Sequence, residues 1–179
     1  MILTTMFIAL GFGPSSGGHM SSWQAQTPSI LCCESVQATW KNDWAVFAST
    51  LSSLFKRGAL KADLEAQFAG QIVNWTGVVK EVRRTGDQVS VQIDMPAKTI
   101  DLSDGTTTTV DRLGLTPVGA EAQKWVAIAT GTSVRFRTTL KGDGLFPVIG
   151  LMQGMGDNAG KKIVIISTEG LELLSAVRK

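Results

Sequence analysis

The stretch that decides the fold is residues 70–95, GQIVNWTGVVKEVRRTGDQVSVQIDM. Its second half alternates between apolar and polar residues, which is typical of a strand with one buried face. The first half, 72–82, is rich in β-branched residues but changes phase at Gly77, where we expect a bulge or a sharp bend. Residues 84–87, RTGD, supply the turn between the halves, because Gly86 can take a positive φ. The stretch therefore predicts a long bent strand paired with a shorter regular one, an arrangement with which small barrels close without an exposed edge.

The composition is that of a globular protein. The 179 residues are 44% hydrophobic and 18% charged, which argues against a disordered chain, and they suffice for one domain with appendages. The formal net charge of +2 gives no electrostatic reason to expect a dedicated nucleic-acid-binding protein, although local basic patches stay open. With no tyrosine and a single histidine, chemistry based on those side chains has little to draw on.

Residues 1–33 predict a flexible or targeting segment that precedes the folded domain. The apolar run 1–12 is shorter than the roughly 20 residues that cross a bilayer, and it resembles the apolar part of a signal peptide. No basic residue precedes Lys41, although a signal peptide has a positively charged segment before its apolar part. Both a cytoplasmic and an exported location therefore stay open, as do membrane anchoring and a mis-assigned start. Adjacent Cys32 and Cys33 rarely bridge each other, because the ring would be strained. We expect two small apolar residues there; lipidation, metal binding and an intermolecular disulfide are the alternatives.

A helical lead-in is expected over residues 34–69. Apolar residues at spacings of three and four predict a helix over 34–55 with one apolar stripe. The stripe consists of Val36, Trp40, Trp44, Phe47, Leu51 and Leu54. A second, shorter helix is expected over 60–68. The two tryptophans are compatible with a platform for a ligand, but their spacing favours packing of the helix against the domain core.

The rest of the chain predicts short strands and one further helix. Pro96 is expected to end the second strand, since proline cannot donate a ladder hydrogen bond. The polar run 106–109 is expected to be an exposed edge strand after a turn at 103–105. The strand expected over 161–168 is apolar on both faces, so it should be central or covered. The remaining elements expected are a helix over 119–126, strands over 132–140 and 145–152, a loop over 153–160 and helical turns in 169–179.

This order of elements resembles that of the OB-fold, a five-stranded Greek-key barrel with a helix between its third and fourth strands. Residues 68–79, FAGQIVNWTGVV, and residues 131–136, GTSVRF, are similar to segments of the tRNA_anti-like group of OB domains, in which an amphipathic helix leads into the barrel. The resemblance implies a mainly β fold with an OB-like barrel over 70–168, preceded by the helices and followed by a tail, 169–179. A small β-sandwich or another six- to seven-stranded barrel is the alternative architecture.

The sequence offers little for catalysis. Nothing matches the phosphate-binding GxxxxGK[ST] motif, a CxxC pair or the zinc motif HExxH, and the glycine-rich run 150–160 is expected to be a turn. The one histidine, His19, lies in the linker-like run GPSSGGHMSS, which argues against a Ser-His-Asp triad. We therefore expect a protein that is not an enzyme, with no catalytic residue, no cofactor and no bound metal.

The remaining candidate chemistry is a binding face. OB-folds bind their ligands on the face of strands two and three and in the loops beside it, and single-stranded nucleic acid needs cations for its phosphates and aromatics for its bases. The candidate ligand-binding residues are five cations on or next to predicted strands and one nearby aromatic: Lys80, Arg83, Arg84, Arg135, Arg137 and Trp75. Acidic residues accompany these cations, so an ordinary solvated face explains them more simply. We expect a non-catalytic binding module for a protein or an envelope component; single-stranded nucleic-acid binding through the basic strand faces is the alternative.

Overall fold

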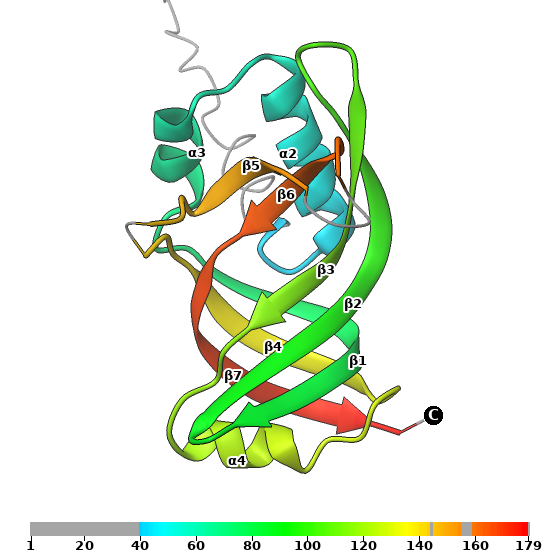
Figure 1. Ribbon diagram of the computed structural model, residues 1–179, viewed down its shortest axis with the longest axis vertical. Helices are drawn as coiled ribbons and strands as arrows, with labels where there is room; N and C mark the ends of the chain where they lie inside the picture. Colours follow the sequence, from blue (N-terminus) through cyan, green and yellow to red (C-terminus); the bar gives the residue numbers. More distant parts are fainter. Residues whose placement is uncertain (1–39, 144, 155–158, 179) are drawn as a thin grey trace, which may run out of the picture.

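The computed structural model describes residues 40–143, 145–154 and 159–178 (Figure 1). The fold is mainly β: five strands form an antiparallel sheet in the order β3-β2-β1-β4-β7, and β5 pairs with β6 in a separate two-stranded sheet. The bounds are α2 Trp44–Lys56, α3 Lys61–Phe68, β1 Ile72–Thr85, β2 Gln88–Asp101, β3 Thr107–Leu115, α4 Ala120–Val126, β4 Ser133–Leu140, β5 Ile149–Gln153, β6 Lys162–Ile166 and β7 Thr168–Val177. The helices α2 and α3 lie near one end of the twisted sheet together with β5 and β6, and α4 lies at the other end (Figure 1).

The paired strands β1 and β2 confirm the predicted hairpin, but β2 is not the shorter strand that was expected, because each strand has 14 residues. Thr85 pairs with Gln88 around a tight turn in which Gly86 has a φ of 61°. The irregularity in β1, however, lies between Val79 and Glu81 and not at Gly77, so the predicted position of the bulge was wrong.

Gly77 has a different role in the hairpin. A Cβ at this position would lie 2.4 Å from Cγ2 of Ile93 and 2.7 Å from Sδ of Met95. Glycine therefore permits the close approach of β2 over β1, which is one of the reasons for a glycine inside a strand.

Pro96 does not end β2, contrary to the prediction. The strand continues to Asp101, and the pairing with β3 is irregular between Asp94 and Lys98. Because proline lacks an N–H, it is tolerated in a sheet where the regular ladder is interrupted. The carbonyl oxygen of Pro96 accepts a hydrogen bond from Nε1 of Trp44 at 2.8 Å, which ties β2 to α2.

The helix α2 begins later than predicted. Asp43 caps it, since its Oδ1 accepts hydrogen bonds from the N–H groups of Ala45 at 2.7 Å and Val46 at 3.2 Å. Aspartate is among the preferred N-cap residues, and this local bond favours a helix start over the continuous helix expected from residue 34. The apolar face also ends on Phe55 instead of Leu54, which is only half-buried. The first part of the predicted helix, residues 34–39, lies outside the described residues.

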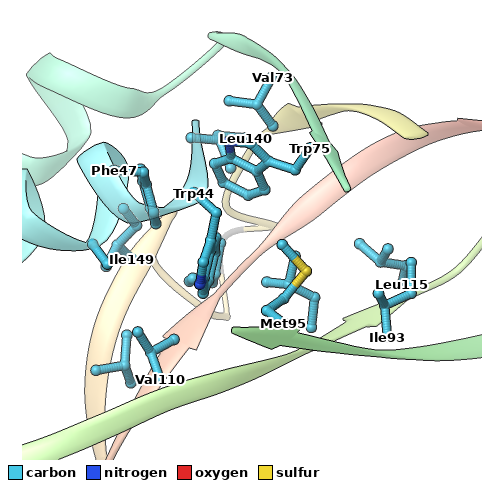
Figure 2. Packing of buried hydrophobic residues seen from close by; sticks show 14 of the residues in the cluster. Trp44, Phe47, Val73, Trp75, Ile93, Met95, Val110, Leu115, Leu140 and Ile149 are labelled. Carbon is cyan, nitrogen blue, oxygen red and sulfur yellow. The ribbon is translucent and has the colours of Figure 1, made fainter. Parts of the chain in front are cut away.

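The aromatic side chains of this helix lie in the core, as their spacing favoured. Figure 2 shows Trp44 and Phe47 facing Trp75 of β1, and the ring centroids lie 5.1 Å and 4.7 Å from that of Trp75. Phe68, the last residue of α3, packs edge-on against Phe47 at 5.5 Å. Such ring pairs add about 0.5–1.5 kcal/mol each beyond the burial of their surface, so the helices are firmly attached to the sheet.

The strand β4 confirms its predicted alternation. Its buried residues are Val134, Phe136, Thr138 and Leu140. The hydroxyl of Thr138 donates to the carbonyl oxygen of Glu169 at 2.9 Å, so this buried polar group is paired. The helix expected over 119–126 is also present as α4, whose Trp125 is fully buried.

The C-terminal residues form the strand β7, so the predicted helical turns in 169–179 were wrong. This strand pairs with β4 along most of its length and completes the five-stranded sheet. Leu171 is 4% exposed, which anchors the strand in the core. The strand could not be predicted from its pattern, because bulges interrupt its period of two. The register with β4 shifts between Arg135 and Phe136 and again between Arg137 and Thr139.

The last strands before β7 also differ from the prediction. β5 starts at Ile149, later than residue 145. Within the described residues β6 pairs with β5 alone, so it is not central, but Val164 and Ile166 are buried and Ile163 and Ile165 are half-buried, in agreement with the alternative that the strand is covered. The glycine-rich run 153–160 is only partly described, and residues 1–39, with Cys32, Cys33 and His19, lie outside the described residues.

No helix in the described part of the chain is long and apolar enough to span a bilayer.

Candidate binding groove

The predicted cations of β4 point outward. Arg135 lies beside Thr76 and Arg137 beside Asn74 in the pairing of β4 with β1. The guanidinium of Arg137 donates to Oδ1 of Asn74 at 3.0 Å and forms an ion pair with Glu172 of β7 at 3.1 Å. These bonds hold Arg137 against the sheet.

The predicted cations of β1 do not share one face. Arg83 lies opposite Ser90, whose side chain is exposed, and Arg84 lies opposite Val89, whose side chain is buried. Neighbouring strand residues point to opposite faces, so the two arginines diverge. Arg83 pairs with Glu81 at 2.9 Å, and Nε of Arg84 donates to the carbonyl oxygen of Gly86 at 3.0 Å.

The six predicted binding residues therefore do not form one site. Lys80 is exposed at the β1 bulge, but Trp75 is 1% exposed, and its indole N–H donates to the carbonyl oxygen of Trp40 at 3.3 Å. Asn74, which holds Arg137, lies about 30 Å from Arg83 along β1 at the usual rise per residue. The structure thus places the aromatic ring inside the core and turns Arg84 to the face opposite that of Arg83.

A groove lies instead between the edge strand β3 and the strand β6. Its volume is about 810 Å³, and it is lined by residues 106–112 and 160–164. In Figure 1 the two strands begin next to each other and separate toward their C-terminal ends. The hydroxyl of Thr108 donates to the carbonyl oxygen of Lys162 at 2.5 Å where they are close.

The edge of β3 presents to this groove backbone groups that have no partner among the described residues. The N–H of Leu102 donates to the carbonyl oxygen of Thr106 at 2.9 Å at the start of the β2–β3 ladder. In an antiparallel ladder, residues alternate between those that bond to the partner strand and those whose N–H and C=O point away. Counted from Thr106, the backbone groups of Thr107 and Thr109 point away from β2 and toward the free edge.

The edge of β6 that faces away from β5 also presents backbone groups to the groove. The N–H of Gly154 donates to the carbonyl oxygen of Lys161 at 2.8 Å, and the N–H of Ser167 donates to that of Val148 at 2.9 Å. The alternation then turns the backbone groups of Lys162 and Val164 away from β5. The bond from Thr108 to the carbonyl of Lys162 agrees with this direction. In the described part of the chain, no backbone hydrogen bond joins β3 to β6.

The charges beside the groove are mostly positive. Lys162 forms an ion pair with Asp104 in the turn between β2 and β3. This ammonium group, followed by the hydroxyl and N–H of Thr106, holds the pKa of the Asp104 carboxyl well below its usual range. Arg112 pairs with Asp94 at 3.3 Å, and Lys161 has no ion-pair partner among the residues described.

The sequence pointed to half of this groove. The polar run 106–109 was predicted to be an exposed edge strand, and β3 is the edge of the five-stranded sheet. The other half was not foreseen, because the position of β6 beside β3 depends on contacts between residues far apart in the chain.

The chain matches no protein-family model and no curated protein sequence. Within the described ranges, no group of three or more histidine, cysteine, aspartate or glutamate side chains is arranged to hold a metal ion.

Proposed function

We propose that this chain is a non-catalytic, OB-like binding module that takes an extended segment of another protein into the groove between β3 and β6. One observation carries the proposal: two strand edges with outward-facing backbone N–H and C=O groups flank a single groove. An extended peptide supplies the complementary donors and acceptors at the same spacing, which is how proteins bind by strand addition.

The order of the elements supports the OB-like part of the proposal. Three antiparallel strands, the helix α4 and the strand β4 follow in the order of that fold, and β6 continues into β7 as one interrupted last strand. The similarity of residues 68–79 and 131–136 to the tRNA_anti-like group agrees with this order. In such a barrel the third and last strands lie side by side, and the contact between Thr108 and Lys162 supports that placement.

A protein segment fits the groove better than single-stranded nucleic acid does. Nucleic acid requires aromatic side chains for its bases, and the described residues that line the groove include none. Of the basic strand residues, Arg83 and Arg137 are already paired with carboxylates. The groove, in contrast, offers alternating backbone donors and acceptors, which recognise a peptide main chain.

The proposal is tested by selecting peptides from a phage-displayed library of random dodecapeptides on the full-length chain. Thr109→Pro removes an N–H that faces the groove and leaves the ladder to β2 intact, because proline is tolerated at such edge positions. We expect it to weaken the selected peptides at least about tenfold, since several main-chain bonds are lost when register is broken. Thr109→Val keeps the N–H and the shape of the side chain, so it is the matched control and should bind normally.

The peptides provide a second test of the same idea. N-methylation of alternate peptide amides should weaken binding, whereas methylation of the amides between them should not, because alternate N–H groups of a strand face opposite sides. Peptides that bind Thr109→Pro as well as the unaltered chain would overturn the proposal. Tight binding of a labelled mixed-sequence single strand that falls steeply with salt, and that is lost in Arg135→Ala with Arg137→Ala, would favour the nucleic-acid alternative instead.

A further inference from the structure

An apolar pocket lies next to the groove. It has a volume of about 380 Å³ and is bordered by the end of α2, the start of α3, the turn after β2 and the strand β5. Its buried lining includes Phe55, Leu64, Leu102 and Ile149. A hollow of this kind, with an apolar lining and a few polar groups at the edge, is typical of a binding pocket.

The rim of the pocket carries apolar side chains that are open to solvent. Leu60 is 72% exposed at the start of α3, and Leu151 is 37% exposed on β5. Neither side chain is needed to fill the core in these positions. They gain burial when something enters the pocket, and each buried methylene group then contributes about 0.8 kcal/mol.

Lys162 connects the pocket to the groove. It lines both cavities, and its backbone carbonyl bonds Thr108 while its ammonium group pairs with Asp104. The two cavities therefore meet at Lys162. An extended chain advances about 3.3 Å per residue, so a segment in the groove brings a neighbouring side chain to the pocket within a few residues.

The charges around the two cavities favour an acidic segment. Lys61 borders the pocket and Lys161 borders the groove, and neither has an ion-pair partner in the part of the chain that the structure describes. The only carboxylate that lines either cavity among the described residues is Asp111. Complementary charges at the rim of an interface guide the partner and set its register.

These observations lead to one statement, which rests on the proposed function. We infer that the pocket holds one large apolar side chain of the same extended protein segment that pairs with the edge of β3, and that acidic residues flank this side chain. The groove then supplies main-chain pairing, and the pocket selects which segments bind. This division of roles is the usual one in strand addition.

The experiment uses the dodecapeptides selected on the full-length chain. We expect them to share one leucine, isoleucine, phenylalanine or tryptophan with aspartate or glutamate nearby. Alanine in place of that apolar residue should weaken binding at least about tenfold, as for other buried anchor residues. On the protein side, Leu151→Glu should weaken binding to a similar degree. Leu145→Glu is the matched control, because Leu145 is 88% exposed and borders neither cavity.

A second variant keeps the anchor testable if Leu151→Glu fails to fold. Ser103→Trp places a bulky ring in the exposed turn at the edge of the pocket, and it should block the anchor without altering the core. Peptides that lose affinity with Thr109→Pro but bind Leu151→Glu and Ser103→Trp normally would overturn the anchor and leave the groove in place. Failure to select any peptide, or binding that ignores Thr109→Pro, would overturn the proposed function and the anchor together.

Discussion

The hydroxyl of Thr108 donates a hydrogen bond to the backbone carbonyl of Lys162, and this bond joins two strand edges that share no backbone hydrogen bond within the described residues. Where a sheet closes into a barrel, the closing strands are bonded along their backbones, which removes the exposed edge. Here a side chain makes the contact, and the backbone groups of Thr109 and Val164 stay available in the groove beyond it.

This arrangement should be visible in amide hydrogen exchange of the free protein. The N–H groups of Thr108 and Val110 face β2, whereas that of Thr109 faces the groove. We expect the amide of Thr109 to exchange at least about tenfold faster than those of its two neighbours, since bonded amides exchange only after local opening. Equal protection of the three amides would mean that another segment already covers the edge.

The ion pair between Asp104 and Lys162 should stabilise the chain in a pH-dependent way. The pKa of Asp104 is lowered from its ordinary value of 3.8, so its contribution is fully present above that value and is lost as the pH falls toward the lower folded-state pKa. Asp104→Asn should therefore lower the Tm at pH 7, by a small amount because both side chains are solvent-exposed. Thermal melts across a pH series should show the Tm values of the two proteins converging as the pH falls. A Tm difference that stays constant down to the most acidic sample would contradict a contribution from the ionised Asp104 carboxylate.

The close approach of β2 at Gly77 should make that position intolerant of any side chain. Gly77→Ala brings a Cβ to within 2.4 Å of Cγ2 of Ile93, so strands must shift, and we expect the free energy of unfolding to fall by roughly 1–3 kcal/mol. Gly114→Ala in β3 is the control, because a Cβ there meets nothing within 4 Å. Urea denaturation of both variants provides the comparison. Equal free energies of unfolding for the two variants would show that β2 does not approach β1 closely at Gly77.

The strand β7 should be essential to the domain. Leu171 is 4% exposed, and Leu171→Ala should lower the free energy of unfolding by about 2–4 kcal/mol through the cavity that it leaves. The same substitution at Leu145, which is 88% exposed, should change it by no more than about 0.5 kcal/mol. A C-terminal segment that does not belong to the sheet would give two variants of similar stability in chemical denaturation.

Local signals in the sequence were sufficient for the elements that have a regular pattern. The alternation of residues 132–140 predicted β4 and the outward direction of Arg135 and Arg137, and the stripe through Trp44 and Phe47 predicted the docking of α2. In each case one buried face repeats without interruption, so the period can be read directly.

The errors occurred where contacts between distant segments override local preference. Pro96 remains inside β2 because the β2–β3 ladder is already irregular there and because Trp44 binds its carbonyl. The strand β7 was not predicted, because its bulges break the alternation of apolar and polar residues. Pairing with β4 stabilises the strand although its local pattern is irregular. The groove depends on the approach of β6 to β3, for which neither segment carries a local signal.

The most direct test of the account is amide exchange of Thr109 and Val164 in the full-length chain, measured without and with a selected dodecapeptide at saturating concentration. Their N–H groups face the groove from β3 and β6 respectively. Strand addition should slow exchange at Thr109 and Val164 by about tenfold or more, with little change at Thr108, whose N–H is already bonded to β2. Peptide binding that leaves the exchange of both residues unchanged would contradict the claim that the groove binds an extended protein segment.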